Sequence, residues 1–99
     1  MDISKIEEIL RHYSPEAQTV KAIEELAELQ TELAKLANKQ GDVSKMTSEL
    51  ADVRIMINQV MIIFDVDPED VENWIRFKLD RQIERIREKE KAEADCSWK

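Results

Sequence analysis

Apolar residues recur every three or four positions along most of this chain, which is the spacing of an α-helix, and no segment alternates in the manner of a β-strand. The pattern predicts four helices joined by short turns, over residues 2–12, 15–39, 45–64 and 68–90. The expected fold class is therefore all-α, a four-helix bundle within one domain of residues 1–90. The charged segment 91–99 has no such pattern and is expected to fray.

Two of the predicted helix starts carry capping signals. Ser14 precedes Pro15, and Asp67 precedes Pro68, so each pair offers a side-chain acceptor followed by a proline at the first helical position. Gly41, the only glycine, lies after the second helix and is predicted to end it in the left-handed conformation. The cap of the third helix is left open among three residues: Asp42, Ser44 and Thr47.

The apolar stripes predict which side of each helix is buried. On the second helix the stripe comprises Ala22, Leu26, Leu29, Leu33 and Leu36. The remaining arc of that helix is predicted to be an acidic seam that carries Lys21, Glu24, Glu25, Glu28 and Glu32. The third helix is apolar nearly all round, so we expect it to be central to the bundle or covered by another subunit. The buried face predicted for the fourth helix comprises Val71, Trp74, Ile75, Leu79, Ile83 and Ile86.

Length, charge and cysteine content narrow the possible classes of protein. A chain of 99 residues buries limited surface by itself, so a homodimer or homotetramer is expected. The net charge of −7 argues against nucleic acid and against an anionic membrane surface as partners. Cys96 is the only cysteine, which excludes a disulfide framework. No signal peptide or membrane-spanning segment is visible, so the expected location is cytoplasmic.

Two acidic clusters lie on neighbouring predicted helices. Glu24, Glu25 and Glu28 share one side of the second helix, because residues three or four apart are neighbours on a helix surface. Glu49 and Asp52 are three apart on the third helix, where Glu49 falls on the apolar stripe. Buried carboxylates are normally paired or bound to metal. With no histidine or cysteine nearby, these oxygens suit Mg²⁺, with Mn²⁺ as a substitute.

Three other interpretations of the acidic residues are weighed against a metal site. A solvated acidic face is disfavoured because Glu24 precedes Glu28, and Glu28 precedes Glu32, at a spacing where like charges destabilise a helix. A non-catalytic helical protein-interaction module would keep the apolar stripes without needing an acid at position 49. A di-iron carboxylate bundle would need paired Glu-x-x-His motifs, and this chain has none.

The two acidic clusters together resemble a known signature. Glu24-Glu25-x-x-Glu28 followed by Glu49-x-x-Asp52 is similar to the EExxE…ExxD pattern of the all-α nucleoside triphosphate pyrophosphohydrolases. These are the MazG-like enzymes, with dimeric dUTPase and dCTPase relatives. The resemblance implies an Mg²⁺-dependent enzyme that hydrolyses the bond between the α- and β-phosphates of a (deoxy)nucleoside triphosphate. The products would be a nucleoside monophosphate and pyrophosphate.

The resemblance covers about residues 15–87 and implies roles for individual residues. The Mg²⁺ ligands would be Glu25, Glu28, Glu49 and Asp52. Glu24 would assist them, as a ligand to a further metal or in orienting water. The residues expected to meet the outer oxygens of the triphosphate are Lys21, Lys78 and Arg81. Apart from the resemblance, Asn58 and Gln59 are candidates for contacting the base or sugar because they lie one or two turns beyond Asp52. No motif indicates which base is preferred.

Overall fold

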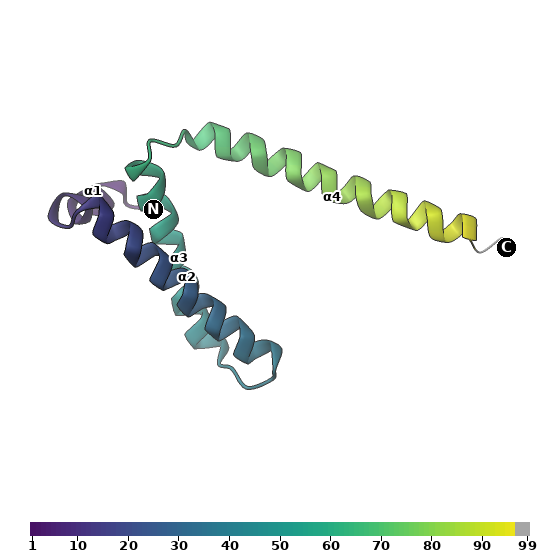
Figure 1. The fold of residues 1–99 in the computed structure, drawn as a ribbon, viewed down its shortest axis with the longest axis horizontal. Helices are drawn as coiled ribbons and strands as arrows, with labels where there is room; N and C mark the ends of the chain where they lie inside the picture. The colour runs from purple at the N-terminus through teal and green to yellow at the C-terminus, as the bar shows by residue number, and fades with distance from the viewer. Residues whose placement is uncertain (97–99) are drawn as a thin grey trace. The chain divides into compact units, whose positions relative to one another are not determined.

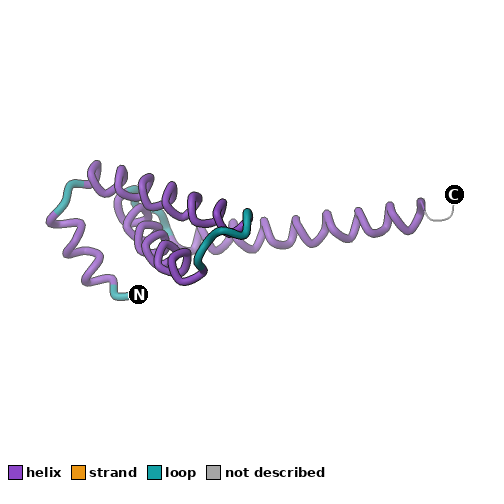
Figure 2. Tube along the Cα trace, turned by 90° about the horizontal axis from the view of Figure 1, so that it is seen from below, coloured by secondary structure: helices purple, strands orange, loops and turns teal. Residues whose placement is uncertain are grey.

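The computed structural model describes residues 1–96 and confirms an all-α chain, with four helices and no strand in that range (Figure 1, Figure 2). The helices are α1 (Ile3–His12), α2 (Pro15–Ala37), α3 (Val43–Ile63) and α4 (Pro68–Cys96). Within this described part, none of the helices combines the length and the apolar composition that crossing a bilayer requires.

The helices begin where the capping signals predict. Ser14 Oγ accepts a hydrogen bond of 3.0 Å from a backbone N–H in the first turn of α2, and Asp67 Oδ1 accepts one of 2.9 Å from the Glu69 N–H. Among the three candidate caps of α3, Asp42 is the one used, because its Oδ1 accepts a 2.8 Å bond from the Ser44 N–H. Local side-chain chemistry therefore sets the start of each of these helices.

α4 is longer than predicted. It continues past Glu90 to Cys96, so residues 91–96 of the segment expected to fray are helical. That stretch consists mainly of Lys, Glu and Ala, which have high helix propensity and extend the helix without needing an apolar stripe. Residues 97–99 of the predicted tail lie outside the described residues.

The loop between α2 and α3 corrects the prediction for Gly41. Lys39, and not Gly41, adopts the left-handed conformation, with φ of 61°. Glycine is needed at position 41 for space, because a Cβ there would lie 2.7 Å from Leu36 Cγ and 2.9 Å from the Leu36 backbone nitrogen. The loop thus folds back against the last turn of α2 at a distance that no side chain permits.

Contacts divide the chain into two units, Met1–Asp65 and the segment that begins at Val66. In the first unit α2 and α3 pack along each other, and α1 packs on α3 (Figure 1). Ile6 is the only residue of α1 that is buried. The second unit contains α4. A single domain over residues 1–90, folded as a four-helix bundle, stays a prediction.

The side of α2 that packs in this unit coincides only in part with the apolar stripe predicted from the sequence. Ala22 is buried and Leu29 and Leu36 are half-buried, but Leu26 and Leu33 are 52% and 48% exposed. The other buried residues of α2 are polar: Gln18, Glu25 and Glu32. α2 is therefore turned so that a largely polar side faces α3, and the predicted acidic seam supplies two of its buried residues.

The predicted buried face of α4 is also wrong for the chain by itself, since none of the residues of α4 is buried. Five members of that face are exposed: Trp74, Ile75, Leu79, Ile83 and Ile86. A single helix forms its own unit here, so it has no second helix within the unit against which to bury its stripe. An amphipathic helix with such a stripe gains most of its stability from packing against something else.

We predict that Gly41→Ala lowers the free energy of unfolding by about 1–3 kcal/mol, because the added methyl group overlaps the side chain and backbone of Leu36. Urea unfolding followed by circular dichroism measures this change. Gln40→Ala, at the exposed neighbouring position, is the matched control and is expected to have little effect. Equal stability of the two variants would show that the loop tolerates a side chain at position 41.

Candidate functional site

α2 and α3 run antiparallel in a register that buried polar residues define. At one level, Lys45 Nζ of α3 lies 3.9 Å from Glu32 Oε1 of α2. Seven residues along each helix, carboxylate oxygens of Glu25 and Asp52 lie within 4.8 Å of each other. One more step of seven residues along each helix reaches two further buried residues, Gln18 and Gln59. The interface between these helices therefore consists of polar layers at seven-residue intervals.

The middle layer contains a group of three acids, the acidic triad Glu25, Glu49 and Asp52. Each contributes one carboxylate oxygen, and the three oxygens lie within 4.8 Å of one another. Among residues 1–96 it is the only group of three or more His, Cys, Asp or Glu side chains gathered in this way. Glu25 is only 6% exposed, and the other two are half-buried. The triad is thus built into the packed side of the hairpin.

Two oxygens of the acidic triad are buried without a hydrogen-bond partner: Glu25 Oε2 and Glu49 Oε2. A buried carboxylate oxygen that lacks a donor has lost its bound water without compensation. Carboxylate oxygens with no nitrogen or sulfur ligand nearby match the donor set of a hard divalent cation. The triad therefore has both the ligand type and the unsatisfied oxygens that such a cation requires.

Lys21 partly neutralises the triad. Its Nζ lies 3.0 Å from Glu25 Oε1, one helical turn away, and about half of its side chain remains exposed. The hydrogen bond to Glu25, followed by the charge of that carboxylate, raises the pKa of Lys21. One lysine faces three carboxylates, so the group retains a net negative charge.

Glu28 acts on the triad without being one of its members. The pKa of Glu49 is raised above its ordinary value of 4.5, first because the carboxyl is partly buried and next because of the negative charge of Glu28. The charges of Asp52 and Glu25 act in the same direction. The structure thus brings together all four residues predicted as metal ligands, three by contact distance and Glu28 through its charge.

The remaining predicted site residues of the first unit lie at the edge of this group. Glu24 is exposed, and its charge acts on Lys21 only after that of Glu25. Asn58 Nδ2 donates a hydrogen bond of 2.7 Å to Met1 Sδ, which places the N-terminal segment over that part of α3. Neither residue belongs to the acidic triad.

Two predicted phosphate contacts, Lys78 and Arg81, belong to α4 in the second unit. The Arg81 guanidinium carbon lies 5.4 Å from the centre of the Phe77 ring, a cation–π contact one turn along the helix. Both cations are exposed, so they are accessible to an anionic partner.

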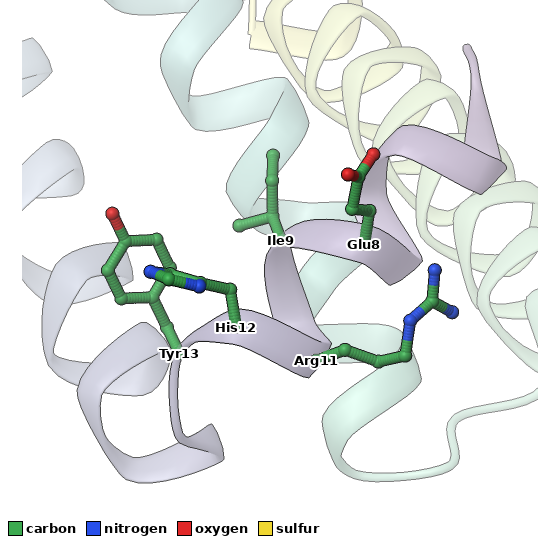
Figure 3. A pocket seen from close by; sticks show the side chains of 5 residues that line it. All are labelled: Glu8, Ile9, Arg11, His12 and Tyr13. Atoms are coloured by element: carbon green, nitrogen blue, oxygen red, sulfur yellow. The ribbon is translucent and has the colours of Figure 1, made fainter.

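A hollow of about 480 Å³ lies at the end of α1 and contains the only histidine of the chain (Figure 3). The His12 ring meets the Tyr13 ring edge to face, with 4.6 Å between centroids. The hollow is lined by Glu8, Ile9, Arg11, His12 and Tyr13 (Figure 3). None of these residues is part of the acidic triad, so the hollow contributes no ligand to it.

Four buried polar residues were not predicted to be buried: Gln18, Glu25, Glu32 and Gln59. Their spacing was visible in the sequence, since positions 18, 25 and 32 in α2 and positions 45, 52 and 59 in α3 are all polar. A seven-residue repeat keeps to one side of two packed helices. The repeat does not identify itself as a packed side because its members are polar, whereas the packed side of a helix is normally recognised by apolar residues.

Comparison with known proteins returns no match for this chain: neither a family model, nor a curated protein, nor a solved structure is significantly similar to it. A role for the acidic triad is therefore inferred from its chemistry and from the sequence motifs that supply it.

We predict that Glu49→Gln stabilises the metal-free protein at neutral pH, because it removes a charge from a crowded group of acids. The raised pKa means that folded Glu49 holds a proton that the unfolded chain releases, so stability present below about pH 4.5 is lost as the pH rises through the raised pKa. Urea unfolding in EDTA between about pH 4 and pH 8 should show this loss in the wild type and less of it in the variant.

Glu16→Gln, at an exposed position outside the triad, is the control for the loss of one carboxylate. The control should leave the pH dependence of the wild type unchanged. A Glu49→Gln variant with the wild-type pH dependence would show that Glu49 is not the group whose raised pKa makes the free energy of unfolding depend on pH.

Proposed function

We propose that this chain is a Mg²⁺-dependent nucleotide pyrophosphohydrolase of the MazG-like all-α type, cleaving free (deoxy)nucleoside triphosphates to monophosphates and pyrophosphate in the cytoplasm. The single observation that carries the proposal is the acidic triad of Glu25, Glu49 and Asp52, with oxygens within 4.8 Å of one another and two of them buried without a partner. Phosphoryl transfer depends mainly on positioning and charge neutralisation, and carboxylates that hold a divalent cation supply both.

Residues of α2 and α3 have different roles in the proposed reaction. Glu25, Glu28, Glu49 and Asp52 would hold Mg²⁺, and Glu24 would assist them as a ligand to a further metal or in orienting water. Bound Mg²⁺ would neutralise phosphate oxygens and lower the pKa of a coordinated water. A carboxylate of the group that is not fully committed to metal accepts the proton of the attacking water. Lys21, already charged and half exposed beside Glu25, is positioned to meet a phosphate oxygen.

The remaining substrate contacts come from two further places. Asn58 lies on α3 beyond Asp52 and contacts the base or sugar. Lys78 and Arg81 of α4 meet the outer phosphate oxygens. Their exposure and charge support this role.

We predict that Asp52→Asn and Glu49→Ala each lower kcat/KM by more than about a hundredfold, since loss of groups that merely support metal ligands already costs 10–100-fold. Pyrophosphate release from a panel of nucleoside triphosphates, with and without Mg²⁺, measures this. Asp95→Asn, an exposed acid near the end of α4, is the matched control and should keep wild-type activity. Circular dichroism checks that helical content is retained. Wild-type rates in Asp52→Asn would place the metal elsewhere.

The active form in this proposal is a homodimer or a dimer of dimers in which four-helix bundles form between chains. Support comes from the amount of apolar surface that one chain leaves uncovered. α2 exposes Val20, Ile23, Leu26 and Leu33, and α4 exposes Trp74, Ile75, Leu79, Ile83 and Ile86. So many large apolar side chains exposed on two helices are typical of a protein that associates through them.

Charge also favours a second copy over an unrelated partner. Residues 1–65 carry twelve acidic and seven basic side chains, whereas residues 76–91 of α4 carry seven basic and only four acidic ones. The basic stretch of one chain therefore complements the acidic first unit of another. Such an arrangement would bring Lys78 and Arg81 of one copy toward the acidic triad of the next.

We predict that light scattering gives a mass of at least twice the 11.6 kDa of one chain, and that Leu33→Glu shifts it toward the monomer. A charge in an apolar interface is costly to desolvate. Thr31→Glu, on the same helix and also exposed, is the control and should leave the mass unchanged. A wild-type mass of one chain would contradict the assembly.

The alternative function is a non-catalytic helical interaction module, and the exposed apolar faces of α2 and α4 favour it too. The two functions differ in what they require of the acidic triad. An interaction module binds its partner equally well with or without Mg²⁺ and tolerates Asp52→Asn. Absence of pyrophosphate release across the panel, from a folded protein with metal present, would favour this alternative.

A further inference from the structure

Gln59 is the most completely buried large side chain in the part of the chain that the structure describes. It is 1% exposed, and its carbonyl oxygen Oε1 has no hydrogen-bond partner. A glutamine that only filled space would be replaced by an apolar residue at lower cost, because desolvation of an unpaired buried amide is not compensated. The amide therefore has a free hydrogen-bonding function at a defined place in the hairpin.

That place is one polar layer away from the acidic triad. Gln59 lies seven residues beyond Asp52 on α3, and Gln18 lies seven residues before Glu25 on α2. Seven residues of helix span about 10 Å. This is comparable to the span of a nucleotide from its α-phosphate across the sugar to the far edge of the base. A nucleotide held by its phosphates at the triad can therefore reach the amide layer.

The opposite direction along the hairpin has different chemistry. There the next layer is Glu32, whose Oε1 lies 3.3 Å from Lys35 Nζ and 3.9 Å from Lys45 Nζ. Two lysines suit the terminal phosphates and not an uncharged base. The order amide, carboxylate, lysine along the hairpin thus matches the order base, α-phosphate, terminal phosphate along a nucleoside triphosphate.

We propose that Gln59, supported by Gln18, recognises the base of the nucleotide, and that α1 moves aside to admit it; this inference rests on the proposed function. A primary amide presents one acceptor and two donor hydrogens side by side, which is the arrangement that pairs with the hydrogen-bonding edge of a base. A base bound at this layer would satisfy the free Gln59 carbonyl. Asn58, the preceding residue, then borders this site, where it contacts the sugar or the edge of the base.

Besides α2, α1 is the helix that packs on α3, so we take it as the element that moves. The Asn58–Met1 contact places the start of the chain over this part of α3, and Ile6 is the one buried side chain of α1. A short helix anchored by a single buried residue opens at a much lower free energy than the whole unit unfolds. Burial of Gln59 in the free protein is therefore compatible with access for a ligand.

The experiment compares two substrates that share a triphosphate and differ in whether they carry a base. Pyrophosphate release is measured for the preferred nucleoside triphosphate and for methyl triphosphate, in the wild type, in Gln59→Leu and in the control Gln30→Leu at an exposed position of α2. We expect Gln59→Leu to lower kcat/KM for the nucleotide at least about tenfold and to leave methyl triphosphate unchanged. Gln30→Leu should change neither.

A second measurement separates failure of this inference from failure of the proposed function. Nucleoside monophosphates are titrated by calorimetry, with Mg²⁺ present, into the wild type and into Gln59→Leu; no reaction occurs, because a monophosphate lacks the bond between the α- and β-phosphates. Weaker binding to Gln59→Leu supports base recognition. A wild type that hydrolyses nucleotides while Gln59→Leu keeps the same preference and affinity overturns it, and leaves the amide as a device that fixes helix register. A wild type that releases no pyrophosphate overturns the proposed reaction instead.

Discussion

The mutual repulsion of carboxylates inside the α2–α3 hairpin is the interaction on which the rest of this structure depends. Glu25, Glu49 and Asp52 converge where two helices would normally pack apolar residues, with Glu28 adding its charge. The apolar contribution to the described core is small, since only Ile6, Ala22 and Val53 are buried. The free energy gained by burying so few apolar side chains does not exceed by a wide margin the repulsion among several close carboxylates. A cation bound at the triad would neutralise this repulsion and stabilise the folded hairpin.

The polar character of that interface explains why so much apolar surface faces outward. A helix has a limited circumference, so a side that packs polar residues against α3 leaves Ile23, Leu26 and Leu33 of α2 exposed. A single small chain rarely exposes so many large apolar residues unless something covers them. Site and assembly are therefore linked, because the rotation of α2 that buries the acids also creates the surface available for association.

The seven-residue spacing of buried polar residues gives the hairpin its register and a chemical direction. A shift of one residue between the helices would separate Glu32 from Lys45 and misalign the acids. Buried polar groups of this kind are known to specify register in packed helices at a cost in stability. Here they also differ in type from layer to layer, which is unnecessary for register alone and suits an elongated ligand with distinct parts.

The sequence by itself determined the helices, the caps at Ser14 and Asp67, and the acids that form the site, because helix periodicity and capping are local properties of a few adjacent residues. It left the cap of α3 open among three residues, and the structure selected Asp42. The apolar periodicity did not locate the end of α4, because residues 91–96 extend that helix by their helix propensity and without an apolar stripe. Only the tertiary structure decided which side of α2 is buried. Hydrophobic periodicity finds the apolar side of a helix but does not say what that side meets. In this chain two members of the apolar stripe, Leu26 and Leu33, stay exposed, whereas Gln18, Glu25 and Glu32 are buried on the packed side of α2.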